Sequence, residues 1–178
     1  MGKSSNIANF KEVVLEFLEH DGNWKAVDSK LKGAFVAKVF MSNPQFILTD
    51  TTHFIGAYLP KAAFDRYRKS KSKQLISKSK DCDFLITDWY LELVKVDSQG
   101  VYTSYADREV RLIINDLKLS PSKEVVVEEY VENIHRDNDV KLQVARLNLQ
   151  EVREITELID CGELSRFEES RKKTLDKS

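Results

Sequence analysis

Apolar and polar residues alternate over three short segments near the start of the chain, at residues 31–41, 45–49 and 53–59. These segments are rich in Val, Ile, Phe and Tyr, which suit the half-buried surface of a pleated sheet. Turn-forming residues at 43–44 and 50–52 separate them. The pattern predicts three consecutive antiparallel strands joined by short turns.

A helix over residues 61–69 follows the third segment, because Pro60 suits the start of a helix and the next apolar residues recur at helical spacing. Two longer segments, residues 84–96 and 109–119, predict a fourth and a fifth strand. Three strands, a helix and two strands form the element order of an oligonucleotide/oligosaccharide-binding (OB) barrel. We therefore expect a mainly β protein, a five-stranded OB-fold barrel (βββ-α-ββ) with helices at both ends.

Helical periodicity marks both ends of the chain. Apolar residues spaced by three and four positions predict an N-terminal helix within residues 6–22. A second stripe of this kind predicts a C-terminal helix at residues 149–161, followed by a highly charged tail. Both helices are predicted to be additions to the barrel.

Residues 124–136 carry two conflicting patterns. Three consecutive valines favour a strand, whereas the later apolar residues recur at helical spacing. We expect an extended start followed by an irregular segment. The predicted organisation is one domain over residues 1–178, with the barrel at 31–119 and a C-terminal extension at 120–178.

The composition of the chain limits which classes of function we expect. The formal net charge of −1 gives no overall attraction to nucleic acid or membrane, and no apolar run is long enough to span a bilayer. The sequence has no recognisable catalytic motif, and His20, His53 and His135 lack metal-ligand spacing. We therefore expect no enzymatic activity, no cofactor, no catalytic residue and no metal site.

The near-neutral total conceals two oppositely charged regions. Residues 61–80 carry a net charge of +7, and residues 121–170 carry −7. The basic region could bind a phosphate backbone or be a solvated loop. Aromatic residues of the third strand could stack with bases or belong to the core. The residues of this nucleic-acid hypothesis are Phe54, Tyr58, Arg68, Lys69, Lys71 and Lys73.

Several segments together resemble a known family. They are FKEVVLEFLEHD (residues 10–21), ILTDTTHFIGAYL (47–59), AFDRY (63–67), DCDFLITDWYLEL (81–93) and LKLSPSKEVVV (117–127). Their order and spacing resemble the OB domain of the yeast "ever shorter telomeres" telomerase subunits, which is similar to that of the animal shelterin subunit that recruits telomerase. The resemblance covers roughly residues 10–127.

This resemblance implies a non-catalytic telomerase accessory subunit located in the nucleus at telomeres. Its OB domain would bind the N-terminal domain of the telomerase reverse transcriptase, and other telomerase or telomere proteins would be further partners. Matching by motif places the partner-binding residues at Asp50, Phe64, Asp65, Arg66 and Asp81, with Phe10 where the family has Trp. We expect a monomer without membrane contact.

The residues themselves also allow other interpretations of these positions and of the function. Asp50 could simply stabilise its own turn, and Asp65 and Arg66 could belong to an ordinary exposed helix face. An OB-fold protein that binds single-stranded DNA or RNA is the alternative function. That hypothesis requires the basic region to lie beside the aromatic face of the barrel, and it predicts salt-dependent binding.

Overall fold

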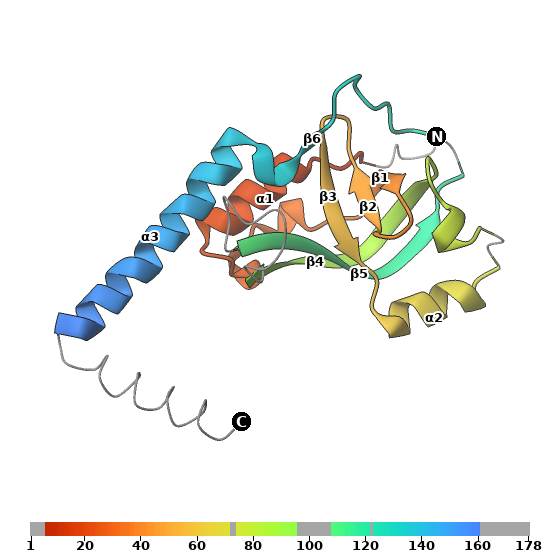
Figure 1. The fold of residues 1–178 in the computed structure, drawn as a ribbon. Coiled ribbons are helices and arrows are strands. Elements are labelled where there is room, and N and C mark those ends of the chain that lie inside the picture. The colour runs from red at the N-terminus through yellow and green to blue at the C-terminus, as the bar shows by residue number, and fades with distance from the viewer. Residues whose placement is uncertain (1–5, 72–73, 96–107, 122, 161–178) are drawn as a thin grey trace.

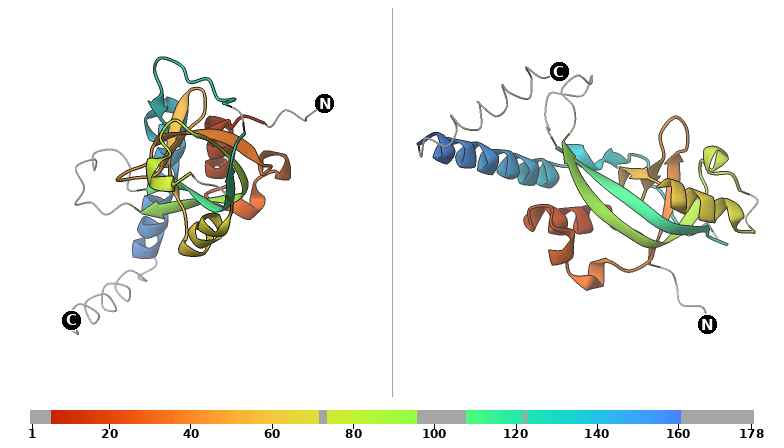
Figure 2. Two further views of the ribbon diagram at one scale, coloured as in Figure 1. Left: turned by 90° about the vertical axis from the view of Figure 1, so that its right-hand side faces the viewer. Right: turned by 90° about the horizontal axis from the view of Figure 1, so that it is seen from below.

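Five strands close on themselves and form a β-barrel (Figure 1). The computed structural model describes residues 6–71, 74–95, 108–121 and 123–160. The strands of the barrel are β1 (Phe35–Met41), β2 (Ile47–Thr49), β3 (His53–Tyr58), β4 (Asp83–Lys95) and β5 (Arg108–Leu119). Seen along its axis in the left view of Figure 2, the barrel is a closed ring of strands.

Strand pairing identifies the fold. β1 pairs antiparallel with both β2 and β4, and antiparallel pairing also joins β2 to β3 and β4 to β5. A parallel pairing of β3 with β5 closes the barrel. This arrangement is that of an OB fold, so the predicted fold class is confirmed.

The strands supply alternate residues to the core, as their pleat requires. In β1, Phe35, Ala37 and Val39 face inward. In β4 the register against β5 shifts around Asp88, and both Ile86 and Trp89 therefore reach the core although they are three residues apart. The bulge lets one long strand curve around the barrel.

Helices occupy both ends of the barrel (Figures 1 and 2). Helix α1 (Phe10–Glu19) lies at one end, where Phe10 meets the ring of Phe35 edge-on at a centroid distance of 5.7 Å. Trp24, just after α1, packs against Trp89 at 5.1 Å. Helix α2 (Lys61–Lys69) lies at the other end, and its bounds are those predicted.

Helix α3 (Asn138–Asp160) starts well before the predicted start at residue 149. Asp137 caps it, because its Oδ1 accepts the N–H groups of Asp139 at 2.9 Å and Val140 at 3.3 Å. The first half of the helix buries Val140, Val144 and Leu147 beside α1, and the second half extends away from the barrel (Figure 1). The predicted end of the helix at residue 161, and the charged tail, lie outside the described residues.

Two other predicted boundaries are wrong. The first strand starts at Phe35, because residues Ser29–Leu31 form a short 3-10 helix that Asp28 caps. The N-terminal helix starts at Phe10, because Asn9 caps it and the preceding segment pairs with Val36 of β1 instead. No helix in the described part of the chain has the length and apolarity to cross a membrane.

A strap (residues 123–131) links the barrel to α3. It arches from the end of β5 over the barrel to β6 (Glu132–Asn133), which pairs with β3 (Figure 1). A 3-10 helix, Ile134–Arg136, leads from there into α3. The strap contains neither helix nor strand, so the extended start stays a prediction, and no sequence pattern indicated β6.

Candidate protein and nucleic-acid interface

Helix α2 presents part of the predicted partner-binding set on its outer side. Its inner side holds Tyr67, whose ring meets Phe84 edge-on at 5.9 Å and whose hydroxyl donates to the carbonyl of Gln74 at 2.7 Å. Because Tyr67 fixes that side, Phe64 is left 36% exposed and Asp65 half-buried. Arg66 donates to the backbone carbonyl of Asn115 in β5.

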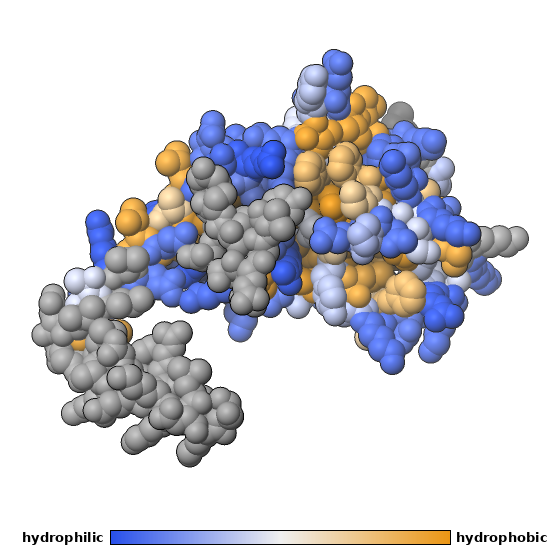
Figure 3. All heavy atoms as spheres, viewed as in Figure 1, coloured by the Kyte–Doolittle hydropathy of each residue, from blue (hydrophilic) through white to orange (hydrophobic). Residues whose placement is uncertain are grey.

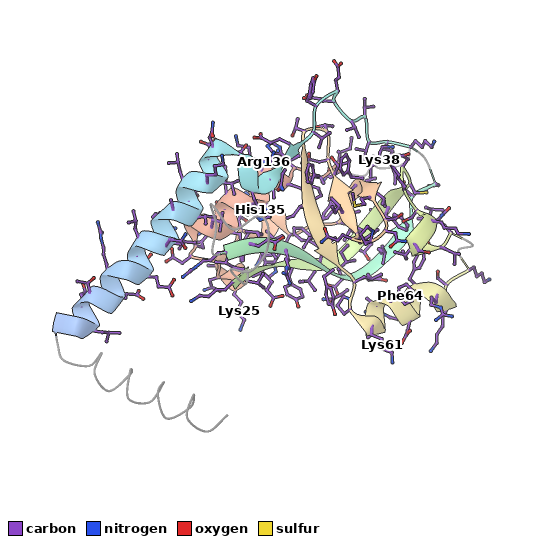
Figure 4. All side chains as sticks on the ribbon, in the orientation of Figure 1. Lys25, Lys38, Lys61, Phe64, His135 and Arg136 are labelled. Atoms are coloured by element: carbon purple, nitrogen blue, oxygen red, sulfur yellow. The ribbon has the colours of Figure 1, made fainter. Side chains whose placement is uncertain are left out.

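We use the name α2 surface for three neighbouring residues of this helix, Phe64, Asp65 and Arg66. Figure 4 shows Phe64 and Lys61 on this helix, away from His135 and Arg136, which lie near the start of α3. The guanidinium of Arg68 lies 5.9 Å from the centre of the Phe64 ring, within range of a cation–π contact. The α2 surface thus combines one partly exposed aromatic ring with charges of both signs.

Asp50 and Phe10, two other residues of the predicted set, lie inside the protein. Each is only 2% exposed. Asp50 Oδ2 accepts the N–H of Phe10 at 2.7 Å, and Oδ1 accepts those of Thr52 at 2.8 Å and His53 at 2.7 Å. The carboxylate therefore closes its own turn and holds the first residue of α1. The structure thus gives both residues an internal role, and their contact with a partner stays a prediction.

Asp81, the remaining member of the set, is exposed just before β4. Its φ of +67° is unusual for a residue with a side chain. Its N–H donates to the carbonyl of Val39 at 2.8 Å, which holds this turn against β1. Asp81 lines a groove beside the strap, and no residue of α2 lines that groove. The sequence-predicted set is therefore divided among the α2 surface, this groove and the interior.

The outer side of β1 and β3 carries an aromatic pair that the sequence reasoning found only in part. Phe40 and Phe54 stack in parallel, with ring centres 5.0 Å apart and an interplanar angle of 7°. Tyr58, further along β3, is 60% exposed. Phe40 was missed because it comes next to Phe54 only through tertiary contacts, the pairing of β1 with β2 and of β2 with β3. Figure 3 shows that apolar side chains gather over these strands.

Part of the basic region lies beside the end of β1, the strand that carries Phe40. Ser42 donates through Oγ to the carbonyl of Ser77 at 3.1 Å, which places residues 77–80 beside the end of β1. The exposed Lys78 and Lys80 therefore border the side of the barrel that carries Phe40. The predicted residues Arg68, Lys69 and Lys71 are exposed on and after α2, and Lys73 is outside the described residues.

Asp83 holds the strap at the start of β4. Its Oδ2 accepts the N–H groups of Glu124 at 2.7 Å and Val125 at 2.9 Å. Lys38 Nζ lies 3.0 Å from the other oxygen, an ion pair without hydrogen-bond geometry. At the far end, Thr51 and Thr52 accept the N–H groups of Glu128 and Glu132. A groove of about 570 Å³ remains between the strap and the outer surface of β1.

One cluster offers metal-ligating atoms. The ligand atoms of His53, Glu132 and Asp137 lie within 4.8 Å of one another. However, Lys11 Nζ lies 3.2 Å from Asp137 Oδ2, and His53 Nε2 lies 3.0 Å from the same oxygen. Burial acts to raise the pKa of Asp137, but its hydrogen bonds with His53, Lys11 and the backbone N–H groups of Val140 and Asp139 together lower the pKa below its usual value. These charged contacts link α1, β3 and the start of α3.

Similarity to known proteins decides the family. The family model described as telomere-binding protein beta subunit (TEBP beta) matches residues 19–157. The chain belongs to this family. Two curated relatives are the telomere-binding protein subunits beta of Sterkiella nova and Stylonychia mytilus. The Sterkiella nova protein is 31% identical over 135 residues, which cover 76% of this chain and 35% of that protein. The Stylonychia mytilus protein is 27% identical over 180 residues, which cover 97% of this chain and 46% of that protein.

The chain spans less than half the length of these curated TEBP beta relatives. A solved structure with a similar outline is that of the Est3 telomerase subunit from the yeast Hansenula polymorpha. It has a TM-score of 0.49 and 12% identity, with 80% of this chain and 87% of that chain covered. Membership of the TEBP beta family agrees with the expectation of a telomere-associated OB-fold protein. Membership of the yeast telomerase subunit family stays a prediction.

Proposed function

We propose that this chain is the OB-fold part of a non-catalytic protein that acts at telomeres in the nucleus. Its membership of the TEBP beta family carries this proposal, because the curated relatives are named as telomere-binding subunits. The finer part of the proposal is that the chain docks on the N-terminal domain of the telomerase reverse transcriptase through the α2 surface.

The chemistry of the α2 surface supports docking on a protein. Phe64 offers an aromatic side chain that a partner could cover, and Asp65 and Arg66 place opposite charges next to it. Aromatic and Arg side chains are frequent binding hot spots. Charges at the rim of an interface mainly control partner choice and association rate. A small surface of this composition fits a transient, regulated contact.

Charge reversal tests the docking proposal. We would measure the affinity of the full chain for the purified N-terminal domain of the reverse transcriptase of the same organism, by biolayer interferometry. Asp65→Lys should weaken binding by about tenfold or more, equivalent to about 1.4 kcal/mol. Glu19→Lys is a matched control with the same change of charge, because Glu19 is exposed at the end of α1, which lies at the other end of the barrel from α2.

Two outcomes would count against this docking site. Unchanged binding by a folded Asp65→Lys variant would show that α2 is not the docking surface. An equal loss in the Glu19→Lys variant would point to a general charge effect. Arg66→Glu is a second probe, but it also removes the hydrogen bond to Asn115, so its urea midpoint must be measured alongside.

Single-stranded DNA is the second candidate ligand, and one specific observation favours it. The Phe40–Phe54 pair lies on the outer side of the barrel, and the segment that carries Lys78 and Lys80 is held at the end of β1 by the bond between Ser42 and Ser77. Aromatic rings that stack with bases, together with cations that neutralise phosphates, are the usual means of binding single strands. Fluorescence anisotropy with a G-rich telomere-like oligonucleotide at two salt concentrations tests it. Binding that weakens steeply with salt would support it, and no binding at micromolar protein would reject it.

A further inference from the structure

The middle of the strap has backbone groups that are unused. Its two ends are held by Asp83 and by the turn between β2 and β3. Between these anchors, the N–H groups of Val126 and Val127 make no hydrogen bond with any described residue. Val126 is also 76% exposed, which is high for a valine.

The sequence of the strap favours a strand at this position. Three consecutive valines have high strand propensity, yet residues 125–127 pair with no strand in the described part of the chain. Val125 points inward and is 4% exposed, so the segment is fixed in place by its side chain. An anchored, unpaired segment of high strand propensity is a template onto which another strand can add.

A groove runs beside this segment. Its volume of about 570 Å³ is within the range of typical ligand sites. The strap forms one wall with Val125, Val126 and Val127, and the outer surface of β1 contributes Phe40 and Lys38. Asp83 neutralises Lys38 at the base of the groove, since the two groups are 3.0 Å apart. Thr49, Asp81 and Lys123 also line the groove, which therefore combines five apolar with four polar residues.

The charge of the strap restricts what the groove could hold. Glu124, Glu128 and Glu129 flank the valines, whereas Lys123 is the only basic residue of the strap. Carboxylates at this density repel phosphate groups and attract Lys and Arg. A nucleic-acid strand would be disfavoured along the strap, and a basic peptide would be favoured.

We propose that the strap groove binds an extended peptide of a partner protein, with alternating basic and apolar side chains. The peptide would add as a strand along Val126 and Val127, with main-chain hydrogen bonds to their free N–H groups. Its apolar side chains would contact Phe40 and the valines, and its basic side chains would face the glutamates. This site is separate from the α2 surface, so its test does not depend on telomerase docking. It shares Phe40 with the candidate single-strand surface, so the peptide and an oligonucleotide would compete there.

Nuclear magnetic resonance of the 15N-labelled full chain tests the proposal. The probe is the acetylated hexapeptide Lys-Val-Thr-Val-Lys-Val, and the comparison peptide is Glu-Val-Thr-Val-Glu-Val. The basic peptide should cause saturable shifts of the Val126 and Val127 amide signals and slow their hydrogen exchange. The acidic peptide should bind at least about tenfold more weakly.

Two variants of one exposed residue separate backbone pairing from side-chain contact. Val126→Pro removes the N–H and should reduce peptide affinity at least about tenfold. Val126→Thr keeps both the N–H and the branched side chain, and its affinity should stay within about threefold. Urea midpoints of both variants would confirm that the fold is retained.

Three results would overturn the proposal. The first is the absence of shifts at Val126 and Val127 with saturating basic peptide. The second is equal binding of the basic and acidic peptides, or full binding by a folded Val126→Pro variant. The third is a titration in which a single-stranded oligonucleotide, and neither peptide, shifts these two signals, because the groove would then be a nucleic-acid site.

Discussion

Replacing Asp50 should destabilise the protein, because its carboxylate connects three separate backbone donors. Two of these donors belong to the buried residues Phe10 and His53, and the third belongs to Thr52. The bond to Phe10 ties the first turn of α1 to the turn between β2 and β3, 40 positions away in the chain. Asp50→Ala would leave all three N–H groups without this acceptor.

The expected loss follows from these contacts. A buried donor left without a partner costs about 1–3 kcal/mol, and two donors here are buried. Adding the weaker loss at Thr52, we expect Asp50→Ala to lower the free energy of unfolding by about 3–5 kcal/mol. A domain of this kind has a total stability of about 5–15 kcal/mol, so the change is a large share of it.

Urea unfolding followed by tryptophan fluorescence would measure this loss. Trp89 is 7% exposed and in contact with Trp24, so the signal reports the core near α1. With a urea slope of about 2 kcal/mol per molar, the midpoint should fall by roughly 1.5–2.5 M. Asp65→Ala is the matched control, since a change on the outer side of α2 should alter stability by no more than about 0.5 kcal/mol.

A midpoint for Asp50→Ala that equals that of the Asp65→Ala control would refute the reasoning. It would mean that the buried carboxylate does not hold α1 and the turn together. If such a stable Asp50→Ala variant also lost binding to the reverse transcriptase, the original prediction of a docking role for Asp50 would gain support.

Two further predictions concern acid stability and nucleic acid. His135 Nε2 accepts the N–H of Val110 at 3.0 Å and burial lowers the pKa of His135, so the unfolded chain takes up the proton first. The contribution of His135 to stability should therefore be fully present above about pH 6.5 and be lost as the pH drops below it. His135→Gln should flatten this pH dependence in urea midpoints measured between pH 7.5 and 5. An unchanged pH dependence in the variant would contradict the prediction. If single-stranded DNA binds, Phe54→Ala should weaken it by about 1–3 kcal/mol in anisotropy titrations, whereas Phe64→Ala should have no effect.

The strand order was predictable because each segment reports its own environment. Alternation in the three early segments, and the two longer ones after the helix, reflects one buried side for each strand. The bounds of α2 also followed from local signals, since Pro60 precedes it and apolar residues mark its inner side. In contrast, α3 was placed too late because its cap, Asp137, forms part of a cluster with His53 and Lys11 that sequence spacing does not reveal.

The candidate sites also differ in whether their residues are close together in the sequence. Phe64, Asp65 and Arg66 are neighbours on one short helix, so a motif could place them together. Phe40 and Phe54 meet only through strand pairing, and Val126 faces an open groove only because Asp83 fixes the strap. These residues are far apart in the chain, and local patterns contain no information about such contacts.

The sequence alone determined the strands, the short helix and hence the OB fold, because the periodicity of buried side chains is a local property. Only the tertiary structure decided which polar residues are internal. In the sequence Asp50 looks like any other aspartate in a turn. In the structure it is 2% exposed and its carboxylate accepts three backbone N–H groups. The free energy of burying a charge depends on all groups that surround it, and these groups are assembled only when distant segments fold together.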